Sequence, residues 1–234
     1  MTAEETPVSA TSMARMGSVC SLLGGIIFLL SGAGFFVFQV TTFDWNSIKS
    51  ISEYLSRVPI GSTMWTLINL GSAIASFLAI GGVLALADRI HPANDGLVRW
   101  TSTLAVIGYA IIAVSNIADL YQIRQMTSGY LQLGPSAQSA VEAMGRGSLD
   151  PASNLRFLTI GPWFLAAGWL SLHGGRLPKA LAYLGVIAGV VALVFVTVSF
   201  LELQTLTLIT AAIAVLFHPV WLIWTGVVLG RREP

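Results

Sequence analysis

Charged side chains are scarce in this sequence. Of its 234 residues only 10% are Asp, Glu, Lys or Arg, whereas 55% are hydrophobic. A soluble globular domain carries about 25% charged residues. So few charges leave too little polar surface to cover a water-soluble body of this size, and most of the exterior must therefore face lipid. The net charge of +1 also argues against nucleic acid as a partner.

Cysteine and histidine are scarce too. The single cysteine, Cys20, lies in an apolar run, so no internal disulfide and no CxxC pair can form. Of the three histidines, His173 stands at the inner end of its apolar segment, whereas His218 is roughly 16 Å from the inner end of its own. They differ too much in depth to share a haem. Because HExxH, GxSxG, P-loop and dinucleotide patterns are also absent, we expect no metal and no cofactor.

Six apolar segments are long enough to cross a bilayer, which takes about 20 mostly apolar residues. They cover residues 17–40, 63–87, 97–118, 157–173, 180–201 and 206–229. Long unbroken runs predict helices, because the strands of a membrane barrel alternate between apolar and polar residues. The first segment exceeds the core of a signal peptide, about 7–15 residues, so we expect it to be retained. The predicted fold is an all-α integral membrane protein, a six-transmembrane-helix bundle forming one membrane domain over residues 1–234.

Lysine and arginine predict how the chain is oriented. Six spans place the N-terminus, the loops after the second and fourth spans, and the C-terminus on one side. That side carries seven of the twelve Lys and Arg residues in short connections; the other five are spread over the longer connections 41–62 and 119–156. Short cytoplasmic loops are enriched in these residues. The sequence therefore predicts a bacterial-type cytoplasmic (inner) membrane protein with cytoplasmic N- and C-termini.

The two long outer connections are predicted to contain short amphipathic helices. Residues 45–58 place apolar side chains at helical spacing opposite a charged stripe, which fits either a helix on the membrane surface or one folded over the bundle. In the second connection, "PSAQSAVEAMG" predicts a helix capped by Ser136 and stopped by Gly145.

Small residues recur at helical spacing in four of the spans. In a bilayer such residues let helices approach closely, because lipid tails provide no hydrophobic force for association. They predict a compact bundle and leave open whether the chain also forms a homo-oligomer. The stripes are Gly17, Ser21 and Gly25; Gly71, Ala75 and Ala79; Gly185 and Gly189; and Gly226 and Gly230.

Polar residues concentrate in the outer half of the predicted bundle. The span directions place Asn69, Asn116, Asp119 and Glu202 there, and His218 near mid-depth. Polar groups at membrane depth usually face the bundle interior or a water-filled cavity. The sequence thus predicts an outward-facing polar pocket lined by these five residues. In the alternative interpretation, Asp119 and Glu202 are solvated at the head-group level, and the two asparagines only bond neighbouring helices.

His218 is followed directly by Pro219 in the last span. A proline within a helix removes one backbone donor and frees the carbonyl four residues earlier, here that of Val215. The histidine needs a hydrogen-bond partner at this depth and should point inward. The pair therefore predicts a kinked, locally hydrated position, which serves either as a structural kink or as a ligand or proton site.

The end of the chain resembles a known family. "GRLPKALAYLGVIAGVVALV" followed by "HPVWLIWTGVVLG" is similar to the closing part of an uncharacterised bacterial multi-pass membrane family, domain of unknown function 4386. Leu177, Pro178, Lys179 and Pro219 match that family's pattern, whereas His218 departs from it. "SISEYLSRVP" resembles another uncharacterised six-span family about as well. Neither resemblance implies an activity.

Three hypotheses follow from the sequence. The first is a non-enzymatic membrane protein that binds or passes a small molecule or lipid through the outward-facing pocket. The second is a structural or accessory subunit whose packing stripes and outer loops contact a larger membrane complex. The third is an intramembrane enzyme that uses His218; it has the least support, because no catalytic motif accompanies the histidine.

Overall fold

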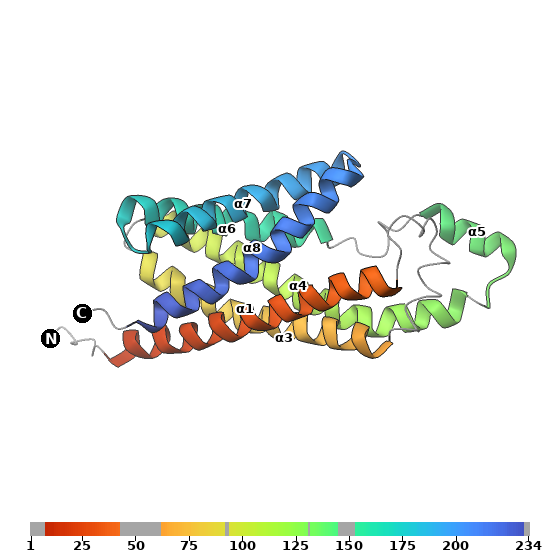
Figure 1. Ribbon diagram of the computed structural model, residues 1–234, viewed down its shortest axis with the longest axis horizontal. Coiled ribbons are helices and arrows are strands. Elements are labelled where there is room, and N and C mark those ends of the chain that lie inside the picture. Colours follow the sequence, from red (N-terminus) through yellow and green to blue (C-terminus); the bar gives the residue numbers. More distant parts are fainter. Residues whose placement is uncertain (1–7, 43–61, 92–93, 131, 145–152, 232–234) are drawn as a thin grey trace.

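Long helices make up nearly all of the described chain. The computed structural model describes residues 8–42, 62–91, 94–130, 132–144 and 153–231, and contains no strand in these ranges. The predicted all-α class is confirmed. The helices are α1 (Val8–Thr42), α3 (Ser62–Ile90), α4 (Asp95–Tyr130), α5 (Pro135–Met144), α6 (Ser153–Gly174), α7 (Lys179–Phe200) and α8 (Gln204–Gly230) (Figure 1).

Six of these helices are long and apolar enough to cross a membrane. Their apolar stretches begin and end within five residues of the segments predicted from the sequence. The chain is therefore a membrane protein built on six spanning helices. The stretches are Ser12–Phe38, Thr63–Ile90, Asp95–Tyr121, Asn154–Gly174, Lys179–Phe200 and Thr205–Gly230.

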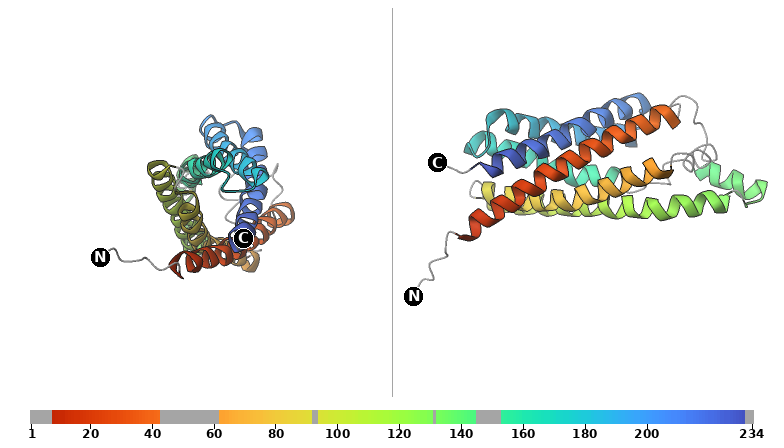
Figure 2. Two further views of the ribbon diagram at one scale, coloured as in Figure 1. Left: turned by 90° about the vertical axis from the view of Figure 1, so that its left-hand side faces the viewer. Right: turned by 60° about the horizontal axis from the view of Figure 1, so that its bottom comes forward.

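The six long helices form a closed ring. Each packs against the next long helix along the chain, and α8 packs against α1. The end-on view shows them arranged around a common axis (Figure 2). In this order α4 lies opposite α8. The start of α1 and the end of α8 lie at the same end of the bundle, here named the terminal end; the opposite end is the far end (Figure 1).

The seam between α1 and α8 depends on glycine. A Cβ atom on Gly226 would lie 2.6 Å from the backbone nitrogen of Leu22 and 2.8 Å from the carbonyl oxygen of Ser18. The Ser18 hydroxyl also donates a hydrogen bond to the Gly226 carbonyl oxygen at 2.7 Å. On the same seam, a Cβ on Gly25 would lie 2.8 Å from the Pro219 carbonyl oxygen. Only a residue without a side chain allows this approach.

The other predicted small-residue stripes also pack within the chain. Gly17 faces Ala85 of α3, and a Cβ on Gly189 of α7 would lie 2.7 Å from the backbone nitrogen of Leu165 on α6. Ala75 and Ala79 of α3 are fully buried beside Gly24 of α1. The small residues of these stripes therefore lie at the contacts between neighbouring helices of the ring.

Exposed aromatic residues mark where the membrane meets water. Trp100, Trp169, Tyr183 and Trp224 stand on four different helices, each four to six residues from the helix end at the terminal end. Tryptophan and tyrosine favour membrane interfaces. On α4, Tyr121 is 68% exposed and lies 21 residues beyond Trp100, or about 32 Å along the helix. This length matches the hydrocarbon core, about 30 Å thick.

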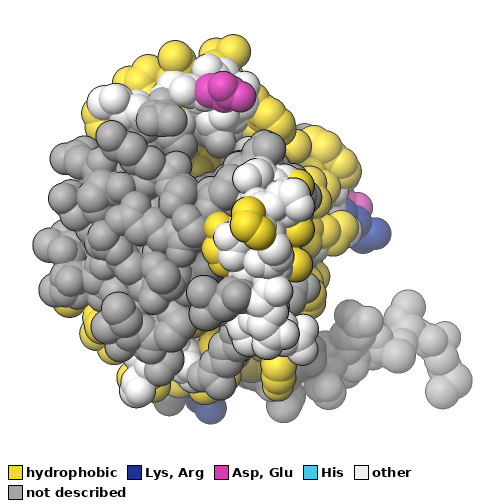
Figure 3. All heavy atoms as spheres, turned by 90° about the vertical axis from the view of Figure 1, so that its right-hand side faces the viewer, with side chains coloured by type: hydrophobic (Ala, Val, Ile, Leu, Met, Phe, Trp, Pro, Cys, Tyr) yellow, Lys and Arg dark blue, Asp and Glu magenta, His cyan; other side chains and the backbone are white. Residues whose placement is uncertain are grey.

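The surface between these levels is apolar. Viewed from the far end, hydrophobic side chains form much of the rim that is not drawn in grey, and few charged side chains are visible there (Figure 3). Helix α4 continues nine residues past Tyr121, to Tyr130. The side chain of Gln138 on α5 donates a hydrogen bond to the Tyr130 carbonyl oxygen at 3.1 Å. The far end thus extends beyond the apolar band.

The predicted helix in the second outer connection is confirmed, but its predicted cap is wrong. Helix α5 begins at Pro135, and the Gly134 carbonyl accepts its first backbone hydrogen bonds, from Ala137 and Gln138. Proline suits the first helical position because its missing N–H would have no intrahelical partner there. Ser136 therefore lies inside the first turn. Gly145 and the amphipathic stretch 45–58 lie outside the described residues.

Candidate functional site

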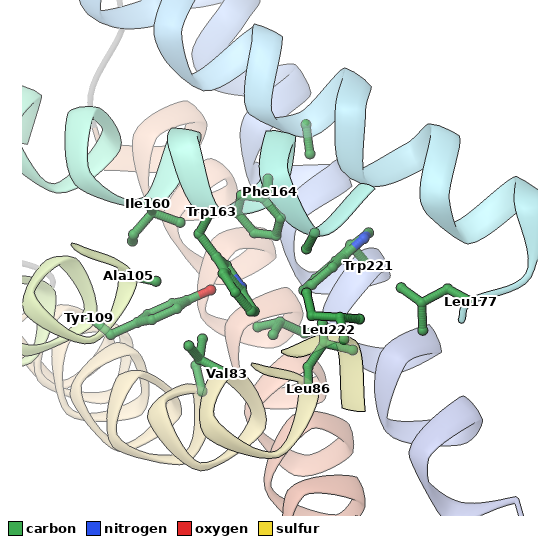
Figure 4. Packing of buried hydrophobic residues seen from close by; sticks show 14 of the residues in the cluster. Val83, Leu86, Ala105, Tyr109, Ile160, Trp163, Phe164, Leu177, Trp221 and Leu222 are labelled. Carbon is green, nitrogen blue, oxygen red and sulfur yellow. The ribbon is translucent and has the colours of Figure 1, made fainter. Parts of the chain in front are cut away.

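The interior of the ring is filled in the terminal half. Trp163 of α6 and Trp221 of α8 are almost completely buried there, together with Val83 and Leu86 of α3. Figure 4 shows these side chains converging from three helices. These side chains belong to the main hydrophobic core of the described residues, so this half of the ring is close-packed.

The far half of the ring contains a cavity of about 450 Å³. All six spanning helices contribute to its wall. The polar side chains of the wall come mainly from α3 and α4, whereas α7 and α8 contribute mostly alanine and valine. Four of the five predicted site residues, Asn69, Asn116, Asp119 and His218, line this one cavity.

The His218 imidazole lies at the floor of the cavity and makes a hydrogen bond that crosses the ring. The hydroxyl oxygen of Tyr109 on α4 lies 2.7 Å from Nε2 of His218 on α8. Tyr109 is fully buried. Since α4 and α8 stand on opposite sides of the ring, this bond links two helices that are not ring neighbours. His218 therefore points inward, as the sequence predicts, and has the partner that a buried imidazole needs.

Three aromatic rings surround the His218 imidazole. Its centroid lies 4.8 Å from that of Phe28, 5.5 Å from that of Tyr109 and 5.5 Å from that of Phe164. The planes are tilted or edge-on, which are favoured arrangements for aromatic contacts. The second ring nitrogen, Nδ1, has no hydrogen-bond partner among the described residues. Because His218 also lines the cavity, Nδ1 is the atom it can offer to a ligand.

Helix α8 runs without interruption through Pro219. The proline cannot donate a hydrogen bond to the Val215 carbonyl oxygen. Both Val215 and Pro219 line the cavity. A hydrogen-bond acceptor is therefore freed beside the cavity, one helical turn from His218.

The two asparagines of the polar wall are oriented by their own helices. The Asn69 side-chain nitrogen donates to the Trp65 carbonyl oxygen at 2.9 Å, and that of Asn116 donates to the Ile112 carbonyl oxygen at 2.7 Å. These bonds turn each amide nitrogen toward the helix backbone. Each Oδ1 then remains without a hydrogen bond among the described residues, on a side chain that lines the cavity.

Two opposite charges stand at the far end of the cavity. Asp119 follows Asn116 by three residues, so the two side chains share one face of α4. Asp119 lies ten residues from Tyr109, or about 15 Å along the helix. Arg156 enters from the start of α6, and its guanidinium carbon lies 5.6 Å from the centre of the Phe157 ring. The cavity therefore runs from charged residues near the interface to the His218 pair at mid-depth.

Glu202, the fifth predicted residue, does not line the cavity. It lies exposed in the turn between α7 and α8, where its backbone has a φ angle of 56°. This left-handed conformation reverses the chain between two antiparallel helices, and glutamate adopts it only rarely. The side chain belongs to the surface of the far end, away from His218.

The remaining histidines lie near the terminal end. His173 is exposed, and its Nδ1 lies 2.9 Å from the Trp169 carbonyl oxygen. His91 pairs with Asp95 at 2.6 Å on the surface. Within the described ranges, no three His, Cys, Asp or Glu side chains come together as metal ligands would.

Sequence reasoning missed several residues of the site. Tyr109 lies within an apolar run and carries no charge, so nothing in the sequence separates it from core residues. Arg156 was not among the five residues predicted to line the pocket. The aromatic side chains of the wall were not predicted either, because aromatic residues are frequent throughout the spans. They are Phe28, Phe35, Trp65, Phe157 and Phe164.

Comparison with known proteins places the chain in a family. The model of a family described as a domain of unknown function (DUF4386) matches residues 20–226. The chain belongs to this family, and the similarity covers far more than the closing third. No curated protein and no solved structure matches the chain significantly.

Proposed function

We propose that this protein binds a small amphiphilic molecule, such as a single-chain lipid, in the ring cavity without converting it chemically. The observation that carries the proposal is a cavity of about 450 Å³ with a polar wall and an apolar wall. Small-molecule sites typically measure about 300–1,000 Å³ and combine apolar surface with a few polar groups. This volume fits a lipid with one acyl chain better than a lipid with two acyl chains.

The closed floor favours binding over open passage. Below the Tyr109–His218 hydrogen bond, the ring is filled by Trp163, Trp221 and their neighbours. A ligand can therefore occupy the far half while this bond is intact. Passage through the ring requires both the bond and the packed core to rearrange.

Purification with bound material tests the proposal. The full chain, extracted in a mild detergent and analysed by mass spectrometry, is expected to retain a small amphiphile in about equimolar amount. Ala192 on α7 is buried and lines the cavity. Replacing it with phenylalanine fills part of the space, so we expect Ala192→Phe to retain at least about tenfold less ligand, a change of about 1.4 kcal/mol.

Val190 provides the matched control. It stands two residues earlier on α7 and is 47% exposed on the outer surface. Val190→Phe should retain as much ligand as the unmodified chain. A wild-type protein that is empty, or an Ala192→Phe variant that is as full as the control, would contradict the proposal.

We also propose that the terminal end faces the cytoplasm of a bacterial-type inner membrane, so that the cavity lies toward the exterior. Arg89, Arg99, Arg176 and Lys179 stand at the terminal end, close to the aromatic band. Lysine and arginine concentrate in short cytoplasmic loops. This charge distribution supports the orientation.

Cysteine labelling tests the orientation. In a Cys20→Ser background, a cysteine replaces either exposed Ser136 on α5 or exposed Gly96 at the start of α4. A membrane-impermeant maleimide is expected to label Ser136→Cys in intact cells. It should label Gly96→Cys only after the membrane is opened. The reverse pattern would show that the cavity faces the cytoplasm.

A further inference from the structure

We propose that the cavity selects an amphiphile whose head group donates hydrogen bonds, a hydroxyl or a protonated amine, over one that only accepts them. This inference rests on the proposed function and specifies the ligand class. It follows from the orientation of Asn69 and Asn116, whose Oδ1 atoms are hydrogen-bond acceptors on the cavity wall.

The orientation of these two amides is set by chemistry. Each side chain contacts a backbone carbonyl oxygen four residues earlier in its own helix. A carbonyl oxygen cannot donate a hydrogen bond to another carbonyl oxygen, so the amide nitrogen must make this contact. The amide oxygen must then point elsewhere. Two independent helices repeat the arrangement, and together they place two acceptors on the same wall.

Neighbouring groups strengthen this acceptor character. Asp119 stands one turn beyond Asn116, and an ionised carboxylate only accepts hydrogen bonds. The Ser72 hydroxyl, on the same stretch of α3 as Asn69, can turn to accept as well. A head group that also only accepts hydrogen bonds would leave the two amide oxygens, of Asn69 and Asn116, desolvated and without partners. An unsatisfied buried polar group destabilises a complex by more than a formed bond stabilises it.

Arg156 does not reverse the preference. It is a donor on the α6 side of the same cavity, but Asp119 places an opposite charge at the same end. The two formal charges sum to zero, so this end does not attract an anion by net charge. The neutral amides of Asn69 and Asn116, which lie deeper in the cavity, therefore determine which head group binds.

The opposite wall accommodates the apolar part of the ligand. Ala188 and Ala192 of α7 and Ala214 and Val215 of α8 face the cavity with small, apolar side chains. Asn116 lies seven residues from Tyr109, about 10 Å above the floor. A bound molecule thus lies with its polar edge toward α3 and α4 and its apolar edge toward these small side chains of α7 and α8, above His218.

Three probes that differ only in head group test the inference. They are a monoacylglycerol, an alkylamine and a fatty acid of the same medium chain length, each with a brominated chain that quenches tryptophan fluorescence. Trp65 lines the cavity, so Trp65→Phe identifies the part of the signal that comes from this site. In the delipidated full chain, the monoacylglycerol and the alkylamine should both bind about tenfold more tightly than the ionised fatty acid.

Leucine substitutions identify the residues responsible. Asn69→Leu and Asn116→Leu keep a similar shape but remove the acceptors, so each should reduce the preference and the double variant should abolish it. Fatty-acid binding should stay the same or become tighter, because the penalty for leaving the amide oxygens unpaired disappears with them, and this shows that the cavity remains intact. Asn154→Leu makes the same change in a half-buried asparagine that does not line the cavity, and it should leave the preference unchanged.

The outcomes separate this inference from the proposed function. If no probe binds the unmodified chain, the cavity is not an amphiphile site and both fail. If the fatty acid binds as tightly as the other two, or if the double variant keeps the preference, only the head-group inference is overturned. Preference for the alkylamine alone would assign selection to the Asp119 charge and would also overturn the role of the amides.

Discussion

Replacing Gly226 with alanine is expected to lower the free energy of unfolding by about 3 kcal/mol. The new Cβ would lie 2.6 Å from the Leu22 nitrogen and 2.8 Å from the Ser18 oxygen, both backbone atoms that cannot rotate away. Helix α8 must then move off α1, and the ring opens at the seam that joins its first and last helices. Unfolding of the purified chain in detergent, followed by tryptophan fluorescence, measures the loss.

A glycine in open space provides the control. A Cβ on Gly96, at the start of α4, would meet nothing within 4 Å. Gly96→Ala should therefore keep the stability of the unmodified chain or raise it by up to about 1 kcal/mol, because alanine is the better helix former. If Gly226→Ala does not accumulate as folded protein, size-exclusion profiles of the two variants still distinguish them. Equal stability would show that the α1–α8 seam is not close-packed.

Removing the Tyr109 hydroxyl is expected to lower the free energy of unfolding by about 2 kcal/mol. Tyr109→Phe keeps the ring contacts but leaves Nε2 of His218 without its partner at mid-depth. Adding His218→Leu removes the orphaned nitrogen as well, so the double variant should be more stable than the sum of the two single changes implies. A double-mutant cycle measures this coupling, which we expect to reach about 1 kcal/mol or more.

Tyr183 offers the matched control for this cycle. It is 58% exposed near the terminal end of α7, and Tyr183→Phe should change stability by less than about 0.5 kcal/mol. Additive effects of the Tyr109 and His218 substitutions would contradict the role of their hydrogen bond as a link across the ring.

The six spans were predictable because they depend on local properties. A run of about 20 apolar residues must become a helix in lipid, where each backbone polar group needs an internal partner. The closed ring was not predictable. The stripes at Gly25 and Gly226 showed which faces pack, but many pairings of such faces are compatible with one sequence. Contacts between residues about 200 positions apart decide among them.

The sequence predicted only those site residues whose polar side chains are energetically costly to bury in a membrane. Asn69, Asn116 and His218 stand out in the sequence because a polar group at membrane depth needs a partner or water. Tyr109 did not, since tyrosine is tolerated in apolar surroundings and only the fold brings it to His218. Glu202 was included because its position along the chain suggested the right depth. The turn after α7 instead directs it outward.

The seam between α1 and α8 also determines when the molecule can be completed. The hydrogen bond from Ser18 to Gly226 joins residues 208 positions apart, and a ribosome adds about 5–20 residues per second. Helix α8 is therefore complete only roughly 10–40 seconds after α1 has been synthesised. Throughout that interval the face of α1 that later packs on α8 is in contact with lipid or with another helix. The nascent chain can therefore form a wrong helix pair most easily before translation ends.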